Sequence, residues 1–192
     1  MRKSVRMGGL ARLTLPCVLV FGAYGAQQYS VTDLGTLSGN SVSQAYALNN
    51  AGEGAGSSSS PTAAIAALFS GGKASSLNKI AANVSVATAI NESGEMADYN
   101  ILDNNLNSVF EAFVYSSGSM KNINSPSLFP GGTEASGINN SGQVVGTGYL
   151  SASSFHAFLY SGGKMTDIGP AGSYQASAVT SITRARSLAV IT

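Results

Sequence analysis

The residue types that perform acid–base or nucleophilic chemistry are scarce in this chain. It contains one histidine, His156, one cysteine, Cys17, and nine acidic residues spread over 192 positions. General acid–base catalysis needs a placed proton donor or acceptor, and covalent catalysis needs an activated nucleophile. His156 stands inside a strand-like phrase that recurs along the chain, so a structural role is favoured over a catalytic one. We therefore assign no catalytic residue and predict that the protein is not an enzyme.

The acidic residues do not form a recognisable site either. Glu53, Glu92 and Glu95 cluster near expected turns, where acids are usually solvated, whereas glycoside hydrolysis needs two carboxylates facing each other across a cleft. The loop "DNNLN" at 103–107 offers one carboxylate and lacks the spaced oxygen ligands of a calcium loop. No glycine pair precedes a helix as a phosphate-binding loop would. We assign no metal-binding or cofactor-binding residue and expect no cofactor.

One phrase occurs three times, as "ALNNAGEGAG" at 47–56, "AINESGEMAD" at 89–98 and "GINNSGQVVG" at 137–146. In each copy an asparagine precedes a glycine by three positions: Asn49 and Gly52, Asn91 and Gly94, Asn139 and Gly142. Asparagine side chains bond the backbone two residues on, and glycine accepts a positive φ. The pattern predicts three β-hairpins. The preceding Ala and Leu/Ile are separated by an odd step (Ala87 and Ile90), which predicts a strand that is apolar on both faces.

Two further phrases follow each hairpin. The first is "AALFSGGK" at 66–73, "AFVYSSGS" at 112–119 and "AFLYSGGK" at 157–164, and the second includes "MKNIN" at 120–124 and "MTDIG" at 165–169. Four short strands in about 45 residues, with glycine-rich turns, are typical of a β-propeller blade. The expected fold is all-β, with repeated four-stranded antiparallel units forming a partial, incomplete β-propeller. Residues 112–115 and 157–160 should be buried, and helix should occur mainly near the N-terminus.

Residues 1–25 have the pattern of a secretory signal peptide, with four basic residues and no acid before the apolar run "LTLPCVLVFGA". Ala23 and Gly25 suit the −3 and −1 positions, which predicts cleavage before Ala26. A run of about 11 apolar residues is short for a membrane span, which needs roughly 20. Pro16 disfavours a lipid anchor at Cys17. We expect a secreted or surface-exposed protein with no stable membrane span after removal of the signal.

The expected mature chain is slightly acidic, because nine acidic residues face six lysines and arginines once residues 1–25 are removed. Such a charge lacks the basic patch that binds nucleic acid, so no nucleic-acid partner is expected. Loss of Cys17 with the signal also leaves no disulfide or thiol chemistry.

The three phrases resemble the HAF repeat, a bacterial extracellular repeat named for His-Ala-Phe, which stands here as residues 156–158. The resemblance covers roughly residues 29–179, with "VTDLGTLSG" at 31–39 and "HAFLYSGGKMTDIG" at 156–169 as its strongest phrases. It implies a secreted or surface array, propeller-like, with no established activity for the family. Glu111 and Ile65 replace histidine in the other two copies, which argues against a repeated histidine ligand.

The expected organisation is a signal peptide at 1–25, β repeats at 26–179 and a divergent tail at 180–192. "YQASAV" at 174–179 begins a fourth hairpin, but no Asn-to-Gly turn follows. A frameshift or truncation in the gene and a divergent capping segment both remain open. About three and a half blades would leave apolar faces exposed, so self-association through these blade faces is expected unless further blades cover them.

Two classes of function fit this organisation. The favoured one is a non-catalytic binding or interaction module for a glycan or protein ligand. The alternative is a fragment of an autotransporter passenger or cell-surface adhesin, and a polysaccharide-acting enzyme is the least favoured. The sequence identifies no ligand.

Overall fold

The structure is a computed structural model, and it describes residues 30–77, 84–103 and 108–169. Every regular element in these ranges is a β-strand and none is a helix, which confirms the all-β prediction. All strands lie in one compact unit, Thr32–Thr192. The expected signal peptide (1–25), the divergent tail (180–192) and most of "DNNLN" lie outside the described residues.

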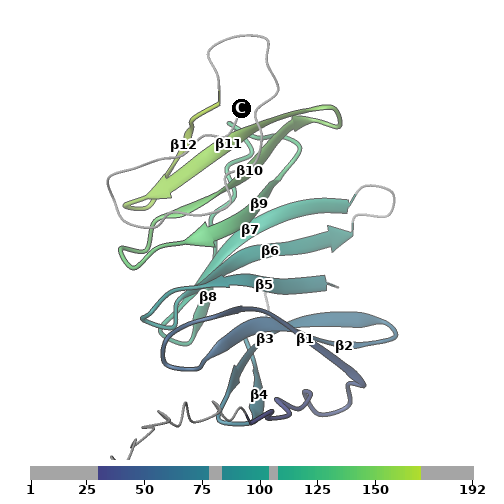
Figure 1. Ribbon diagram of the computed structural model, residues 1–192. Coiled ribbons are helices and arrows are strands. Elements are labelled where there is room, and N and C mark those ends of the chain that lie inside the picture. The colour runs from purple at the N-terminus through teal and green to yellow at the C-terminus, as the bar shows by residue number, and fades with distance from the viewer. Residues whose placement is uncertain (1–29, 78–83, 104–107, 170–192) are drawn as a thin grey trace, which may run out of the picture. The chain divides into compact units, whose positions relative to one another are not determined.

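In the described residues, twelve strands follow one another as three meanders of four antiparallel strands (Figure 1). The first meander contains β1 (Val42–Leu48), β2 (Gly54–Ser60), β3 (Ala63–Ser70) and β4 (Lys73–Ser76). The second contains β5 (Val84–Ile90), β6 (Met96–Asp103), β7 (Ser108–Ser116) and β8 (Ser119–Asn122). The third contains β9 (Thr133–Ile138), β10 (Val144–Ser151), β11 (Ser154–Ser161) and β12 (Lys164–Asp167).

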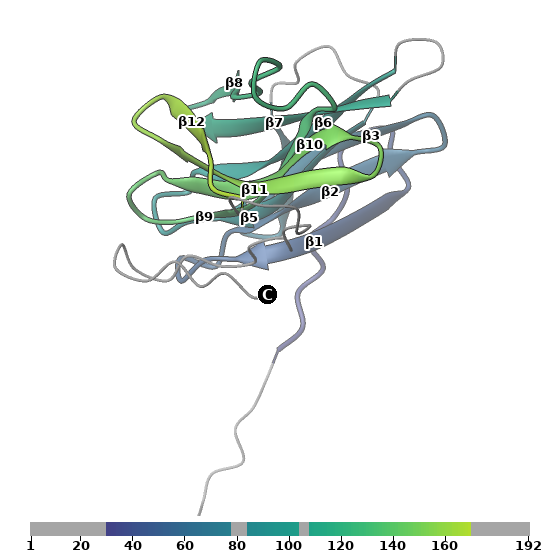
Figure 2. The ribbon, with the colours of Figure 1, turned by 90° about the horizontal axis from the view of Figure 1, so that it is seen from above.

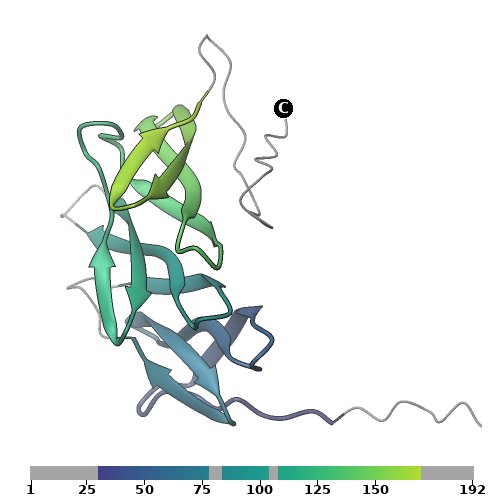
Figure 3. The ribbon, with the colours of Figure 1, turned by 90° about the vertical axis from the view of Figure 1, so that its left-hand side faces the viewer.

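Adjacent meanders touch through a short parallel contact. Ala64 on β3 pairs with Val84 on β5, which joins the first two meanders into one eight-stranded sheet. A parallel bridge between Phe110 and Gly132 occupies the same place between the second meander and the four-stranded third sheet. The described strands form no closed barrel or ring. Figure 3 shows the meanders following one another as successive layers.

The three predicted hairpins are confirmed. The N–H groups of Gly52, Gly94 and Gly142 donate to the carbonyl oxygens of Asn49, Asn91 and Asn139, over 3.0 to 3.1 Å. Each of these glycines has a φ between 70° and 79°, the left-handed region that glycine enters without a steric cost.

The innermost strand β5 buries apolar side chains on both faces as predicted, with Ala87 on one face and Ala89 on the other, but a β-bulge gives the odd Ala-to-Ile step a different meaning. The register of β5 against β6 shifts between Ala87 and Ala89, so Ala87 faces Asp98 and Ile90 faces Met96. Asp98 and Met96 lie two positions apart on β6 and therefore share one face of the sheet. Their partners Ala87 and Ile90 share that face as well. The extra residue at the bulge restores the alternation. β1 has the corresponding shift between Ala45 and Ala47.

The apolar cores lie between successive meanders. One core joins Ala55, Ala66 and Leu77 of the first meander to residues of the second, among them Ala87 and Phe113. A second core joins Ala97, Ala112 and Ile123 to residues of the third meander, including Val144 and Phe158. Burial at 112–115 and 157–160 follows the prediction in part, because Ala112, Phe113, Ala157 and Phe158 are buried while Val114, Tyr115, Leu159 and Tyr160 are half-buried.

The turn asparagines connect one meander to the next. Asn91 Oδ1 accepts the N–H groups of Ser93 (3.0 Å) and Glu95 (2.9 Å), which fixes its own turn. Its Nδ2 donates to Glu95 Oε2 (2.7 Å) and to the carbonyl oxygen of Asn139 in the third meander (3.0 Å). Asn49 Nδ2 donates in the same way to the carbonyl oxygen of Asn91 (3.1 Å). All three asparagines are buried. The turns therefore align one behind another in the view of Figure 2.

We expect Asn91→Ala to lower the free energy of unfolding by about 2 to 4 kcal/mol. The substitution leaves several buried donors and acceptors without hydrogen-bond partners, and each such group costs about 1 to 3 kcal/mol. Asn50→Ala is the matched control. Asn50 is exposed and bonds Glu92 at the tip of the same row of turns, so its loss should cost below about 1 kcal/mol. Urea unfolding of both variants measures the difference, and equal losses would contradict a structural role for the buried asparagine.

Candidate functional site

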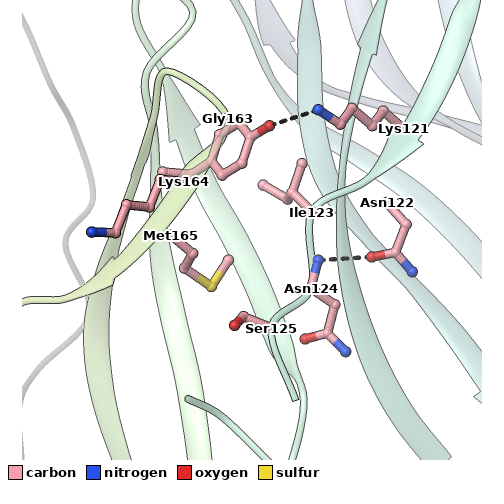
Figure 4. A pocket seen from close by; sticks show the side chains of 9 residues that line it. Lys121, Asn122, Ile123, Asn124, Ser125, Gly163, Lys164 and Met165 are labelled. Atoms are coloured by element: carbon pink, nitrogen blue, oxygen red, sulfur yellow. Dashed lines mark hydrogen bonds between the residues drawn. The ribbon is translucent and has the colours of Figure 1, made fainter. Parts of the chain in front are cut away.

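A polar pocket of about 310 Å³ lies at the seam between the second and third meanders. It is lined by β8 and the segment after it, and by the β11–β12 hairpin: Lys121, Asn122, Ile123, Asn124, Ser125, Tyr160, Gly163, Lys164 and Met165. Its size is at the lower end of the range for small-ligand pockets. Figure 4 shows Lys121 and Lys164 on opposite sides, with Ile123 and Met165 between them.

The apolar base of the pocket is fixed by the core. Ile123 and Met165 are 5% and 7% exposed and belong to the cluster between the two meanders. The N–H of Ile123 donates to the carbonyl oxygen of Ala112 (2.9 Å), which holds the chain as it leaves β8. The pocket therefore rests on well-packed elements.

Hydrogen bonds also orient the amides at the rim. Asn122 Oδ1 accepts the N–H of Asn124 (2.7 Å), and Asn122 Nδ2 donates to Glu111 Oε2 (2.5 Å). Asn124 Oδ1 accepts the hydroxyl of Thr133 (2.9 Å), which in turn accepts the N–H of Ala112 (3.1 Å). This network fixes the orientation of the amides at the rim.

The pocket lining carries two positive charges and no acidic side chain. Lys121 Nζ donates to the Tyr160 hydroxyl (3.1 Å) and lies 5.8 Å from the centre of its ring. An ammonium, a phenol hydroxyl and oriented amides suit a ligand that combines negative charge with hydroxyl groups.

The corresponding seam between the first and second meanders lacks this charge. By the alignment of the strand phrases, Ser75 stands where Lys121 stands, and Ser119 stands where Lys164 stands, while Tyr115 matches Tyr160. The backbone arrangement therefore does not require lysine at these positions. Sequence reasoning missed both lysines. Lys121 departs from Ser75 in the first copy and could have been identified by that difference, whereas Lys164 has a counterpart in Lys73.

His156, the one histidine, forms a cross-strand pair. Its Nδ1 lies 2.9 Å from Asp167 Oδ2, and Asp167 Oδ1 accepts the N–H of Gly169 (2.8 Å). Glu111 and Asn122 form the equivalent pair between β7 and β8. Two chemically different pairs at one structural position indicate that the position links neighbouring strands.

His156→Ala should lower the free energy of unfolding by less than about 1 kcal/mol, because partly exposed ion pairs contribute little. Urea unfolding near neutral pH measures it. A loss of several kcal/mol would show that the ring is a packing element instead of a surface link.

The acids near the turns have structural partners. Glu53 and Glu95 accept hydrogen bonds from Asn49 and Asn91, at 2.8 and 2.7 Å. The Glu92 carboxylate bonds the backbone and side chain of Asn50, at 3.1 and 2.8 Å. No group of three or more His, Cys, Asp or Glu residues that could hold a metal occurs among the described residues.

Asp98 is a buried carboxyl on β6, at a position where the other meanders have glycine. It is 1% exposed, and its Oδ2 has no hydrogen-bond partner. The side-chain oxygen of Asn100, two residues along, is also buried without a partner. Burial raises the pKa of Asp98 to about 8, helped by the charge of Glu134 and opposed by a hydrogen bond with Thr88. A protonated Asp98 avoids a buried negative charge.

The stability of the protein should therefore fall as pH rises from about 4 to about 8. The folded state keeps the Asp98 proton up to pH about 8, whereas the unfolded state releases it near 4, so the unfolded state binds fewer protons between these values. Asp98→Asn should flatten this dependence and be the more stable protein at pH 8, by a few kcal/mol. Urea midpoints from pH 4 to pH 9 test this, and parallel profiles for the two proteins would contradict it.

Comparisons with known proteins find no matching family model, no matching curated protein and no matching solved structure. Among the described residues, no helix has the length and apolar character that crossing a bilayer requires.

Proposed function

We propose that this chain is a secreted or surface-exposed, non-catalytic repeat protein of the HAF type that binds a ligand at the seam between two blades. The three meanders are blades of a partial β-propeller in this proposal. It is supported by the four-strand order of each meander, by the cores between meanders and by the recurring Asn-to-Asn hydrogen bonds. A leader of residues 1–25, cleaved before Ala26, accounts for export.

The pocket at the second seam is the observation that carries the binding role. Lys121 donates to Tyr160 beside an apolar base, Lys164 lies on the opposite side with its ammonium group directed away from that base (Figure 4), and the matching seam has serines at both positions. Because the fold accepts serine at the position of Lys121, a function in recognition explains that lysine. The chemistry of both lysines, with Tyr160 and the amides of Asn122 and Asn124, fits an acidic glycan that offers carboxylates and hydroxyls.

The non-catalytic part of the proposal is supported by the pairing of His156. Its partner Asp167 is matched by Asn122 in the second meander, where Glu111 takes the place of the histidine. A pair whose chemistry changes between equivalent positions serves strand contact better than catalysis.

Binding should be measured with an acidic polysaccharide such as polygalacturonate, and with neutral dextran for comparison, by isothermal titration at low and high salt. We expect binding to the acidic polymer that weakens with salt, and a loss of about tenfold or more in Lys121→Gln/Lys164→Gln, since a charge-assisted hydrogen bond contributes about 1.5 to 3 kcal/mol.

Lys73→Gln is the matched control for this experiment. Lys73 stands at the position of Lys164 in the first meander, on the exposed surface and outside the pocket. It should leave binding unchanged. Equal binding of both polymers, or equal losses in the control and the double variant, would contradict an acidic ligand at this pocket.

A further inference from the structure

Four aromatic rings form a continuous row across the seam between the second and third meanders. Tyr99 and Phe110 lie on β6 and β7, and Tyr149 and Phe155 lie on β10 and β11. Successive ring centres are 5.3, 5.9 and 6.3 Å apart in the order Tyr99, Phe110, Tyr149, Phe155. All four residues are half-buried, so each keeps some contact with solvent. We call these four residues the aromatic row.

Backbone hydrogen bonds hold the centre of the aromatic row in place. The N–H of Gly131 donates to the carbonyl oxygen of Tyr149 (2.8 Å), and the N–H of Tyr149 donates to the carbonyl oxygen of Gly132 (2.9 Å). Gly132 also forms the parallel bridge with Phe110, so one short segment fixes a ring from each meander. A surface that is fixed in this way has little conformational entropy to lose when a ligand binds.

One carboxylate lies against the aromatic row. The Tyr149 hydroxyl donates to Glu134 Oε2 (2.9 Å). The pKa of Tyr149 is raised to about 12, first by burial and then by the hydrogen bond with Glu134 and the charge of that carboxylate. Burial also raises the pKa of Tyr99, and the charges of Asp98 and Glu134 add to the effect. Among the described residues, no lysine, arginine or histidine forms an ion pair with Glu134. The row therefore combines aromatic rings with an uncompensated negative charge.

The repeated fold does not require rings or a carboxylate at these positions. By the alignment of the strand phrases, the first meander has small side chains there: Ser57 for Tyr99, Ser59 for Tyr149, and Ala64 for Phe110 and Phe155. Gln44 and Val86 stand where Glu134 stands, so the carboxylate occurs in the third meander alone. Filling of the seam accounts for the rings, but it does not account for a charged group beside them.

We propose that the aromatic row binds a small organic cation that carries a quaternary ammonium group. A cation is attracted by the negative face of an aromatic ring, and the methyl groups of a quaternary ammonium also bury apolar surface against the rings. Glu134 supplies the opposite charge beside the same rings. No residue of the row lines the lysine pocket, so the two sites are separate and select ligands of opposite charge.

NMR titration of the purified protein with choline tests this site, with the neutral carbon analogue of choline, in which a carbon atom replaces the charged nitrogen, as the matched ligand. Choline should shift the ring signals of Tyr99 and Tyr149 to saturation. The carbon analogue should bind about tenfold more weakly or less, because it keeps the shape and loses the attraction to the rings and to Glu134.

Variants of the aromatic row test which groups hold the cation. Glu134→Gln and Tyr149→Leu should each weaken choline binding about three- to tenfold. Glu92→Gln is the matched control, because Glu92 is an exposed acid at the turn of the second meander and lies outside the row. It removes the same charge and should bind choline as the wild type does.

Three outcomes would overturn the proposal. The first is the lack of a saturable shift with choline, and the second is equal binding of the carbon analogue, which would indicate stacking on the rings without recognition of charge. The third is an equal loss in Glu134→Gln and Glu92→Gln, which would indicate a general effect of net charge. Where urea unfolding shows that Tyr149→Leu does not fold, Glu134→Gln decides, because it keeps the shape of the side chain. The experiment uses choline alone and is independent of the acidic ligand proposed for the pocket.

Discussion

The side-chain amide of one turn asparagine is the interaction on which the stacking of this chain depends. Asn91 closes its own turn with its oxygen and reaches the next turn with its nitrogen, so a single residue couples hairpin geometry to the placement of the next meander. An aspartate in its place could accept the same backbone bonds but could not donate to Asn139. The amide is needed because it carries both functions.

Tight backbone approach beside these turns is the second constraint. At Gly146 an added Cβ would collide with the carbonyl oxygen of Glu134, and the ring of Phe158 lies against the same spot. Gly56 is equally close to the Gln44 carbonyl on the neighbouring strand. Asp98 occupies the matching place in the second meander and is buried without a full set of partners. The aspartate at a position where the other meanders have glycine is therefore a group whose protonation state affects the free energy of folding.

The all-β class and the three hairpins could be predicted from sequence because turn chemistry is local. An asparagine and a glycine three positions apart specify a turn wherever they occur, and the structure has turns at Asn49, Asn91 and Asn139 as expected. The bulge in β5 could not be predicted in this way. It is defined by pairing with β6, and without that pairing the odd step from Ala87 to Ile90 predicts a change of face.

The pocket could not be predicted for a related reason, since Lys121 and Lys164 lie far apart in sequence and only the packing of two meanders brings them to one pocket. The burial of Asp98 depends on packing between meanders, which sequence alone does not show.

The turns and the exposed residues of the seam have different roles, and this difference has an evolutionary consequence. Each buried asparagine bonds its own turn and one neighbour, and the apolar cores join the meanders, so the exposed residues of the outer strands that line a seam are not needed to hold the stack together. Exposed residues there can differ between meanders, as serine and lysine do at the positions of Ser75 and Lys121. A lineage could thus lengthen the array or give one seam a new specificity by a few substitutions, while the buried row of amides stays the same.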